Sequence, residues 1–347
     1  MLVDSPPEAS AETAPAPPNR RAIRSAGLLV SVGVLALVAV ASIAVGAKSM
    51  PLDHVWHGLF QDTGTYDDVV VAERLSRTLL GLLVGVALGL SGAVLQALTR
   101  NPLADPGLLG INLGASAAVV TAISFFGVTS LSGYVWFAFF GAAAVGALVY
   151  ALGGTRNATP VRLALAGTAI SAALYGYLQA VMIMDNAALN KMRFWTVGSL
   201  ASAKNETILQ VLAFFVIGSV LALGLARPLN AMAMGDDTAR ALGAHLNRTR
   251  ALSMAAATLL CGAATAAVGP IMFVGLMVPH VVRSFTGPDM RWILPYAAVL
   301  SPVLLLGADV VGRIVARPAE LQVGIITALI GAPVFIILVR RRRLAQL

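Results

Sequence analysis

The sequence has little of what most enzymes use for chemistry. Its 347 residues include one cysteine, four histidines and only 12% charged residues. The lone Cys261 excludes an intrachain disulfide and, because it sits within an apolar run, indicates a packed thiol. Only one of the four histidines, His280, lies near an apolar stretch, so they do not assemble a convincing Ser-His-Asp constellation. Hydrolysis within a membrane is kept as an alternative, but no catalytic residue is predicted.

Motifs for nucleotides, metals and nucleic acids are also scarce. The nearest approach to a phosphate-binding loop, residues 46–49, has Ser42 where an upstream glycine is required, so we do not expect the chain to hydrolyse ATP alone. His54, His57 and Asp53 are spaced for a metal, but the sequence places no third ligand. No metal and no cofactor are therefore predicted. The basic residues are spread over loops, which argues against nucleic acid as a partner.

Hydrophobic residues are abundant. They make up 58% of the chain, and the mean hydropathy is +0.83, far above that of soluble proteins. Runs long enough to cross about 30 Å of hydrocarbon lie near 27–47, 78–99, 108–127, 132–153, 160–184, 206–226, 249–268, 292–312 and 321–339, with a shorter one at 276–286. The pattern predicts an all-α, polytopic membrane protein with about ten transmembrane helices.

The distribution of charge predicts an orientation in the cell membrane. Ten crossings place both termini on one side, and two thirds of the lysines and arginines fall on that side, so both termini are expected to be cytoplasmic. We expect a disordered cytoplasmic tail over 1–24, a membrane domain over 25–340 and a basic cytoplasmic tail over 341–347. The first apolar run is an alternative secretory signal, but it is longer than such signals usually are.

One segment, Arg74 to Ala115, combines several structural signals. Gly81, Gly85 and Gly89 recur every fourth residue, so they share a helix face that lets a second backbone approach closely. Asn101-Pro102 predicts a turn after this helix. Pro279, beside His280, and Pro333 interrupt later apolar runs and predict hinges, short helices or packing irregularities.

Short motifs run in order over about residues 70–335. They include Arg74-Leu75-Ser76-Arg77, the run from Arg100 to Gly107, Trp195 with Gly198-Ser199-Leu200, Leu229-Asn230, residues 269–283, Asp289 with Arg291, Asp309 with Arg313, Glu320-Leu321 with Gly324, and Gly331-Ala332-Pro333. In this set the chain resembles the permeases of bacterial ATP-driven importers for iron siderophores, haem and vitamin B12. Ser76 and Gln322 stand where that family usually has proline, and we expect both to soften a helix start.

The resemblance implies a type II ABC importer permease that forms one half of a dimeric pore. Its implied partners are a second permease subunit, two ATPase subunits at the cytoplasmic face and an exterior substrate-binding protein. Within the family the chain is most similar to ferric enterobactin permease subunits, which implies transport of an iron(III)–siderophore complex by alternating access. Haem or vitamin B12 is the alternative cargo. A different class, an ion-coupled secondary transporter, would be expected to carry acidic or histidine relays, for which Asp309 is nearly the only candidate.

Three arginines fall on the exterior side, where positive charge is otherwise scarce. By resemblance, Arg74, Arg77 and Arg313 receive glutamates of the binding protein, and the planar guanidinium suits a carboxylate. The alternative is that they snorkel or cap helices. Asp309 lies four residues before Arg313, so the two are expected to pair, and Asp309 then either supports docking or only neutralises Arg313.

The longest polar loop, Leu229 to Arg250, is predicted to contain a short helix bracketed by acidic residues and a glycine. By resemblance this stretch couples to the ATPase, and a solvated loop helix is the alternative. The coupling residues predicted are Gly235, Asp236, Asp237, Ala239, Arg240, Leu242 and Gly243.

A polar stripe runs along the apolar segment 160–184. Thr168, Ser171, Tyr175 and Gln179 are separated by three or four residues and therefore share one helix face. Such a stripe lines either a helix contact or a water-filled path. We carry it as a candidate translocation path, with packing as the equal alternative.

Overall fold

The protein folds as a layered bundle of helices. The computed structural model describes residues 20–46, 50–51, 53, 55–56, 58, 64–128, 130–154, 160–201 and 203–342, and within these ranges every regular element is a helix. The elements are α1 (Arg20–Ala44), α3 (Tyr66–Leu98), η1 (Pro106–Leu109), α4 (Ile111–Phe126), α5 (Leu131–Gly154), α6 (Pro160–Met184), α7 (Asn186–Trp195), α8 (Asn205–Gly224), α9 (Ala226–Ala233), α10 (Asp236–Ala241), α11 (Leu246–Val268), α12 (Val274–Thr286), α13 (Met290–Val315) and α14 (Val323–Arg342).

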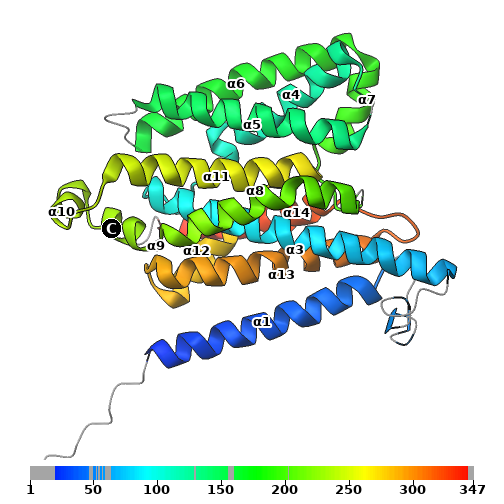
Figure 1. Ribbon diagram of the computed structural model, residues 1–347, viewed down its shortest axis with the longest axis horizontal. Coiled ribbons are helices and arrows are strands. Elements are labelled where there is room, and N and C mark those ends of the chain that lie inside the picture. The colour runs from blue at the N-terminus through cyan, green and yellow to red at the C-terminus, as the bar shows by residue number, and fades with distance from the viewer. Residues whose placement is uncertain are drawn as a thin grey trace, which may run out of the picture.

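The long helices run roughly side by side between two ends of the molecule (Figure 1). One end carries α9, α10, the start of α1 and the C-terminus, and we call it the α10 end. The other carries α7 and the connections from α1 to α3 and from α13 to α14, and we call it the distal end. The start of α1 and the end of α14 therefore lie at the same end of the bundle.

The lengths and apolar character of the helices fit a membrane. Among the described residues, seven helices are long and apolar enough to cross one, and Ile111–Phe126 and Val323–Ile337 are shorter apolar helices. With the 13-residue α12, these give ten helical segments at the positions of the ten predicted runs. The prediction of an all-α polytopic protein with about ten crossings is confirmed.

Helix α3 is much longer than the apolar run that predicted it. Its 33 residues extend about 50 Å at a rise of about 1.5 Å per residue, whereas hydrocarbon is about 30 Å thick. A capping box fixes its start, because the Thr65 hydroxyl accepts from the Asp68 amide and the Asp68 carboxylate accepts from the Thr65 amide at 3.0 Å. Ser76 therefore lies well inside the helix, whereas we expected a helix start. Its hydroxyl donates to the Ala72 carbonyl at 3.0 Å and to Asn205 of α8 at 2.8 Å.

The small residues of α3 lie against α13. A Cβ added at Gly81 would lie 2.5 Å from Leu306, and one at Gly85 would lie 2.5 Å from the backbone of Pro302. At Gly89 it would meet the Ser301 hydroxyl oxygen at 2.2 Å. The glycines that recur every fourth residue in the sequence therefore all lie in the contact between α3 and α13. Gly92 continues the seam onto α12, where an added Cβ would lie 1.8 Å from the carbonyl oxygen of Gly275.

Helix α1 lies at the periphery of the bundle, beside α13 (Figure 1). Its outer face is exposed, with Leu29 at 73% and Leu37 at 72% relative exposure, as expected of a face turned toward lipid. Near its start, the Tyr296 hydroxyl of α13 donates to the Arg24 carbonyl oxygen at 2.6 Å. Helix α1 begins at Arg20, so residues 20–24 of the predicted tail are helical, and residues 1–19 lie outside the described part.

Three segments that are distant in the sequence are hydrogen-bonded to one another near the motif glycines. The Ser199 amide donates to the Val268 carbonyl at 2.8 Å, and the Gly324 amide donates to the Gly198 carbonyl at 3.2 Å. Gly198 and Gly269 have φ of +79°, in the left-handed region that favours glycine.

Pro279 lies within α12 and is buried, and the neighbouring His280 is half-buried.

At the C-terminus the helical structure runs into the predicted basic tail. Helix α14 contains Pro333 and ends at Arg342, so residues 341–342 are helical. Residues 343–347 lie outside the described part.

Candidate functional site

At the distal end, arginines hold the C-terminus of α1. Arg74 of α3, Arg313 of α13 and Arg317 all donate to backbone carbonyls within residues 42–46. The last carbonyls of a helix have no partner inside it, and positive charge is favourable there. The distances are 3.0 and 3.1 Å from Arg74 to Ile43 and Ala44, 2.8 and 3.0 Å from Arg313 to Ser42 and Val45, and 2.6 Å from Arg317 to Gly46.

Asp309 of α13 lies between the guanidinium groups of Arg313 and Arg77. The expected pair with Arg313 is present at 3.0 Å. A second pair, with Arg77 of α3, is bidentate, at 3.0 Å from Nε and 2.8 Å from Nη2. Arg77 also donates to Glu320 at 2.6 Å. Because the Asp309 side chain is completely buried, its charge is balanced within the protein, as a buried carboxylate requires.

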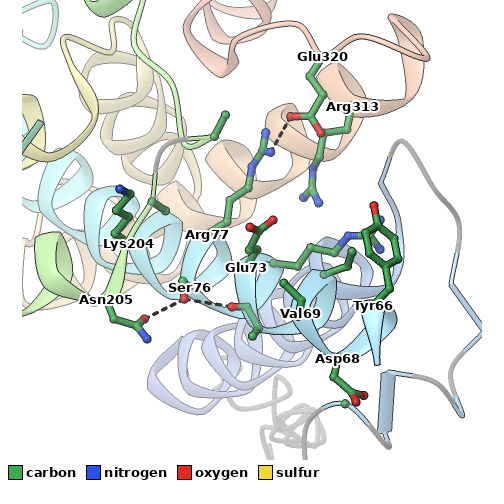
Figure 2. A pocket seen from close by; sticks show the side chains of 16 residues that line it. Tyr66, Asp68, Val69, Glu73, Ser76, Arg77, Lys204, Asn205, Arg313 and Glu320 are labelled. Carbon is green, nitrogen blue, oxygen red and sulfur yellow. Dashed lines mark hydrogen bonds and ion pairs between the residues drawn. The ribbon is translucent and has the colours of Figure 1, made fainter. Parts of the chain in front are cut away.

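Arg74, Arg77, Arg313 and Glu320 line a cavity of about 810 Å³, which we call the distal cavity. Figure 2 shows the Arg77 guanidinium turned toward Glu320, and the Ser76–Asn205 hydrogen bond in the same cavity. Glu73, Lys204 and Glu320 are exposed lining residues. The distal cavity thus presents charge of both signs at its surface.

The three predicted docking arginines share this region but differ in access. Arg313 is 1% exposed and Arg74 is 8% exposed, whereas the Arg77 side chain is 12% exposed at the cavity wall. All three are engaged by groups of this chain. Of the three, Arg77 is therefore the most accessible from the distal cavity.

At the α10 end, the predicted short helix is present. Gly235, with φ of +104°, precedes α10, and Gly243, with φ of +80°, follows it. Ala239 is buried, while Leu242 is 63% exposed. Asp237 and Arg240 form an exposed pair at 2.8 Å. The exposed part of the predicted coupling stretch therefore combines an apolar side chain with a charged pair.

Asp236 differs from its neighbour because it is bound to two other segments. Its carboxylate accepts from Arg100, in the turn after α3, and from Arg250 of α11 at 2.6 Å. Burial alone would raise the pKa of Asp236, but the hydrogen bond from Arg100 and the charge of Arg250 outweigh it, so the pKa lies below its usual value. The carboxylate is therefore ionised at neutral pH.

A second cavity, of about 1070 Å³, lies among α4, α6, α12 and α14, and we call it the apolar cavity. Most of its lining is apolar, including Leu113, Phe273 and Phe335. Asp105 is the acidic residue among the lining residues, and its Oδ1 accepts from the Gly107 amide at 2.7 Å.

The polar stripe on α6 is only partly at this cavity. Tyr175 lines the apolar cavity. Thr168 is exposed and donates to the Ala164 carbonyl at 2.8 Å. Ser171 lies against Gly110, where an added Cβ would be 3.1 Å from its hydroxyl oxygen, and Gln179 is half-buried. Helical periodicity put the four on one face, but the neighbours of α6 determine which of them reaches the cavity.

Sequence reasoning missed a polar contact beside the apolar cavity. The Asn112 Oδ1 of α4 accepts from Thr265 at 2.9 Å and from Cys261 at 3.2 Å, both on α11. The buried thiol is therefore a packing group, as predicted. Nothing in the local sequence pairs residues so far apart.

The other residues singled out in the sequence lie in the turn after α3, on α14 or outside the described ranges. Asn101 is exposed and accepts from the Leu103 amide at 3.0 Å, while Pro102 is buried beside it. Pro333 of α14 lines the apolar cavity. Within the described ranges, no group of three or more potential metal-ligating side chains occurs, and His54 and His57 lie outside those ranges.

Comparisons with known proteins agree with this architecture. The sequence pattern of the FecCD transport family matches residues 34–341. The ferric enterobactin transport system permease protein of Escherichia coli (strain K12) is 45% identical over 326 residues, which are 93% of this chain and 96% of the relative. The hemin transport system permease protein of Yersinia pestis is 37% identical, over 89% of this chain and 94% of its own.

A solved structure shares the fold. It is an inward-facing conformation of an ABC transporter assigned to the metal-chelate type, with a TM-score of 0.80 and 29% identity, covering 91% of this chain and 99% of the other. The resemblance drawn from the sequence motifs is confirmed by both kinds of match.

Proposed function

Because this chain belongs to the FecCD transport family, we propose that it is the permease subunit of an ATP-driven importer that moves an iron(III)–siderophore complex across the cytoplasmic membrane. It is a multi-pass membrane permease and a transport component, not a catalyst. The observation that supports this choice of cargo is the 45% identity, over nearly the whole chain, to a permease named for ferric enterobactin. ATP hydrolysis falls to a separate ATPase subunit.

The apolar cavity supports the choice of a bulky organic cargo. A wall with few fixed charges suits a large chelate that must pass through the pore, because strong binding to the wall would prevent its release. Tyr175, Phe273 and Phe335 are the aromatic residues among those that line the apolar cavity. We assign this cavity to the translocation path, with Thr168, Ser171 and Gln179 of α6 beside it. A second permease subunit completes the path, and the two switch access between the sides of the membrane.

The two ends of the bundle supply two partner surfaces. The exposed α10 stretch is the surface for the ATPase, which places the α10 end and both termini in the cytoplasm. The distal end then faces the exterior, where Arg77, Arg74 and Arg313 receive acidic side chains of a substrate-binding protein. Arginine suits this contact because it binds a carboxylate through two parallel hydrogen bonds.

The function is tested by uptake in cells that lack their own iron-chelate permeases. We expect the chain, expressed with its second permease, ATPase and binding protein, to import a ferric siderophore. Uptake should stop on ATP depletion and persist with an uncoupler. Import of haem or vitamin B12 but of no ferric siderophore would contradict the proposed cargo. Uptake that collapses with the uncoupler while ATP is maintained would favour an ion-coupled transporter instead.

Docking is tested by charge reversal at the distal end. Arg74→Glu should abolish uptake and weaken binding-protein affinity at least tenfold, with normal membrane insertion. Arg74→Gln is the matched control, because it retains a hydrogen-bond donor for α1 without adding negative charge. Wild-type affinity of Arg74→Glu for the loaded binding protein would contradict the docking role.

A further inference from the structure

Asp236, the first residue of α10, shares its carboxylate between two arginines from different parts of the chain. Arg100 is 136 positions away and binds one oxygen, and Arg250 is 14 positions away and binds the other. The Arg250 side chain is only 11% exposed and Asp236 is 31% exposed, so both contacts are partly shielded from water. The carboxylate therefore fastens α10 to two neighbouring segments.

Arg100 begins a turn that is hydrogen-bonded throughout, which we call the Arg100–Gly107 turn. Arg100 itself has φ of +49°, an uncommon conformation for a residue with a Cβ. The Asn101 amide donates to the Gln96 carbonyl at 3.1 Å, and the Ala104 amide donates to the Asn101 carbonyl at 3.1 Å. With the Asp105–Gly107 bond at 2.7 Å, these contacts leave few free torsions. A displacement at Arg100 is therefore expected to be passed along the turn.

The far part of this turn forms the wall of two cavities. Leu103, Asp105 and Gly107 line the apolar cavity. Asn101 and Asp105 also line a smaller cavity of about 200 Å³, which the turn shares with residues of α6. The turn therefore has α10 bound at its beginning and the proposed translocation path along its far part.

The adjacent carboxylate provides an internal comparison. The Asp237 side chain is 99% exposed, and it pairs with Arg240 in the same short helix. It connects α10 to no other element through that pair. The two acidic residues look equivalent in the sequence, but only Asp236 bridges α10, the turn after α3 and α11.

We propose that Asp236 is a positioning residue that links α10 to the Arg100–Gly107 turn, so that movement of α10 is transmitted to the wall of the translocation path. The inference rests on the proposed function, in which α10 contacts the ATPase. Arg100 transmits the movement, and Arg250 keeps Asp236 aligned with α11. Without the link, the ATPase would cycle while the turn stayed behind.

The test uses the complete importer in proteoliposomes, with its binding protein and a ferric siderophore. Arg100→Gln should leave ATP hydrolysis within about twofold of wild type but lower uptake at least tenfold, so that the ATP used per chelate rises about tenfold. Asp236→Asn should raise the same ratio. Arg248→Gln, an exposed arginine two residues before Arg250, is the control and should change neither quantity.

Two results would overturn the inference. One is transport by Arg100→Gln at the wild-type ratio of ATP to chelate, and the other is its failure to co-purify with the ATPase, in which case the contact serves assembly. A wild-type importer without ATP-dependent uptake would instead refute the proposed function, and the linkage with it.

Cross-linking tests the linkage without relying on loss of activity. In a Cys261→Ala background, the double variant Arg100→Cys/Asp236→Cys should transport poorly until a short bis-maleimide joins the two thiols. Uptake should then recover at least fivefold, because a covalent bridge replaces the ion pair. Efficient cross-linking with no recovery, while ATP hydrolysis continues, would show that joining the two segments does not drive transport and would overturn the inference.

Discussion

The two ends of the molecule use the same side-chain chemistry in different surroundings. At the distal end Arg313 and Asp309 are almost fully buried, and their partners are helix carbonyls and each other. At the α10 end Arg100 and Asp236 are 39% and 31% exposed, and they connect separate segments. A buried network holds helix ends in fixed positions, whereas a partly exposed one joins elements that rest on the surface. The comparison distinguishes anchoring from transmission.

The largest expected effect is at the distal end. Arg313→Ala leaves the buried Asp309 with one partner fewer and removes the donor to two backbone carbonyls, those of Ser42 and Val45. Removing one partner of a buried ion pair typically costs about 3–5 kcal/mol. Equilibrium unfolding in mixed micelles would measure the loss. Arg317→Ala, at an exposed site where the side chain donates to the Gly46 carbonyl, is the control and should cost about 1 kcal/mol or less. Equal losses for the two variants would remove the distinction between the buried and exposed contacts.

A smaller effect is expected at the α10 end. Arg250→Gln removes one of the two charged donors to Asp236, and a hydrogen bond to a charged group is worth about 1.5–3 kcal/mol before screening. Because Asp236 is partly exposed and keeps Arg100, we expect a loss of about 1 kcal/mol in the same unfolding measurement. Arg248→Gln should be neutral. A loss as large as that of Arg313→Ala would mean that the α10 end is also an anchor.

The smallest effect is a dependence on pH at the α10 end. Asp289 caps α13 and accepts from Asn230 at 2.6 Å. The hydrogen bond from Arg291 is the largest cause that lowers the pKa of Asp289 to about 2, against the opposing effect of burial. An unfolded aspartate titrates near pH 3.9, so its contribution to stability is complete above that pH and is lost as pH falls toward 2.

Unfolding followed from pH 7 down to pH 2.5 would show this contribution. Wild type should lose stability below about pH 4 more steeply than Asp289→Asn, which has no carboxyl to protonate. Superimposable pH profiles would exclude a role for Asp289 in acid sensitivity.

The apolar runs were sufficient to predict the ten crossings, because each must match the thickness of the hydrocarbon. They did not predict the first turns of α3, where the helix continues as an amphipathic segment from its capping box at Thr65. Helices α7 and α9 have 10 and 8 residues, too few to give an apolar signal. Periodicity found the face of α3 that packs on α13, since a helix contact repeats with the helix.

Contacts between residues distant in the sequence could not be predicted from the sequence alone. The Asp309–Arg313 pair was predicted because four residues separate its members on one helix. The pair of Arg77 with Asp309 spans 232 positions, and no local rule selects that partner. The same holds for the carbonyls at the end of α1: helix capping was the alternative role of Arg74 and Arg313, but the sequence does not identify α1 as the helix they cap.

The attachment of α1 has a consequence for biogenesis. Arg313 is translated 271 positions after Ser42, whose carbonyl it binds. Until α13 is inserted, the end of α1 lacks that donor, and until α1 is beside it, the Arg313 guanidinium lacks the carbonyls that solvate it at the membrane edge. Helix α1 must therefore wait in the bilayer until α13 is inserted, and docking of α1 onto α13 is a late step of assembly.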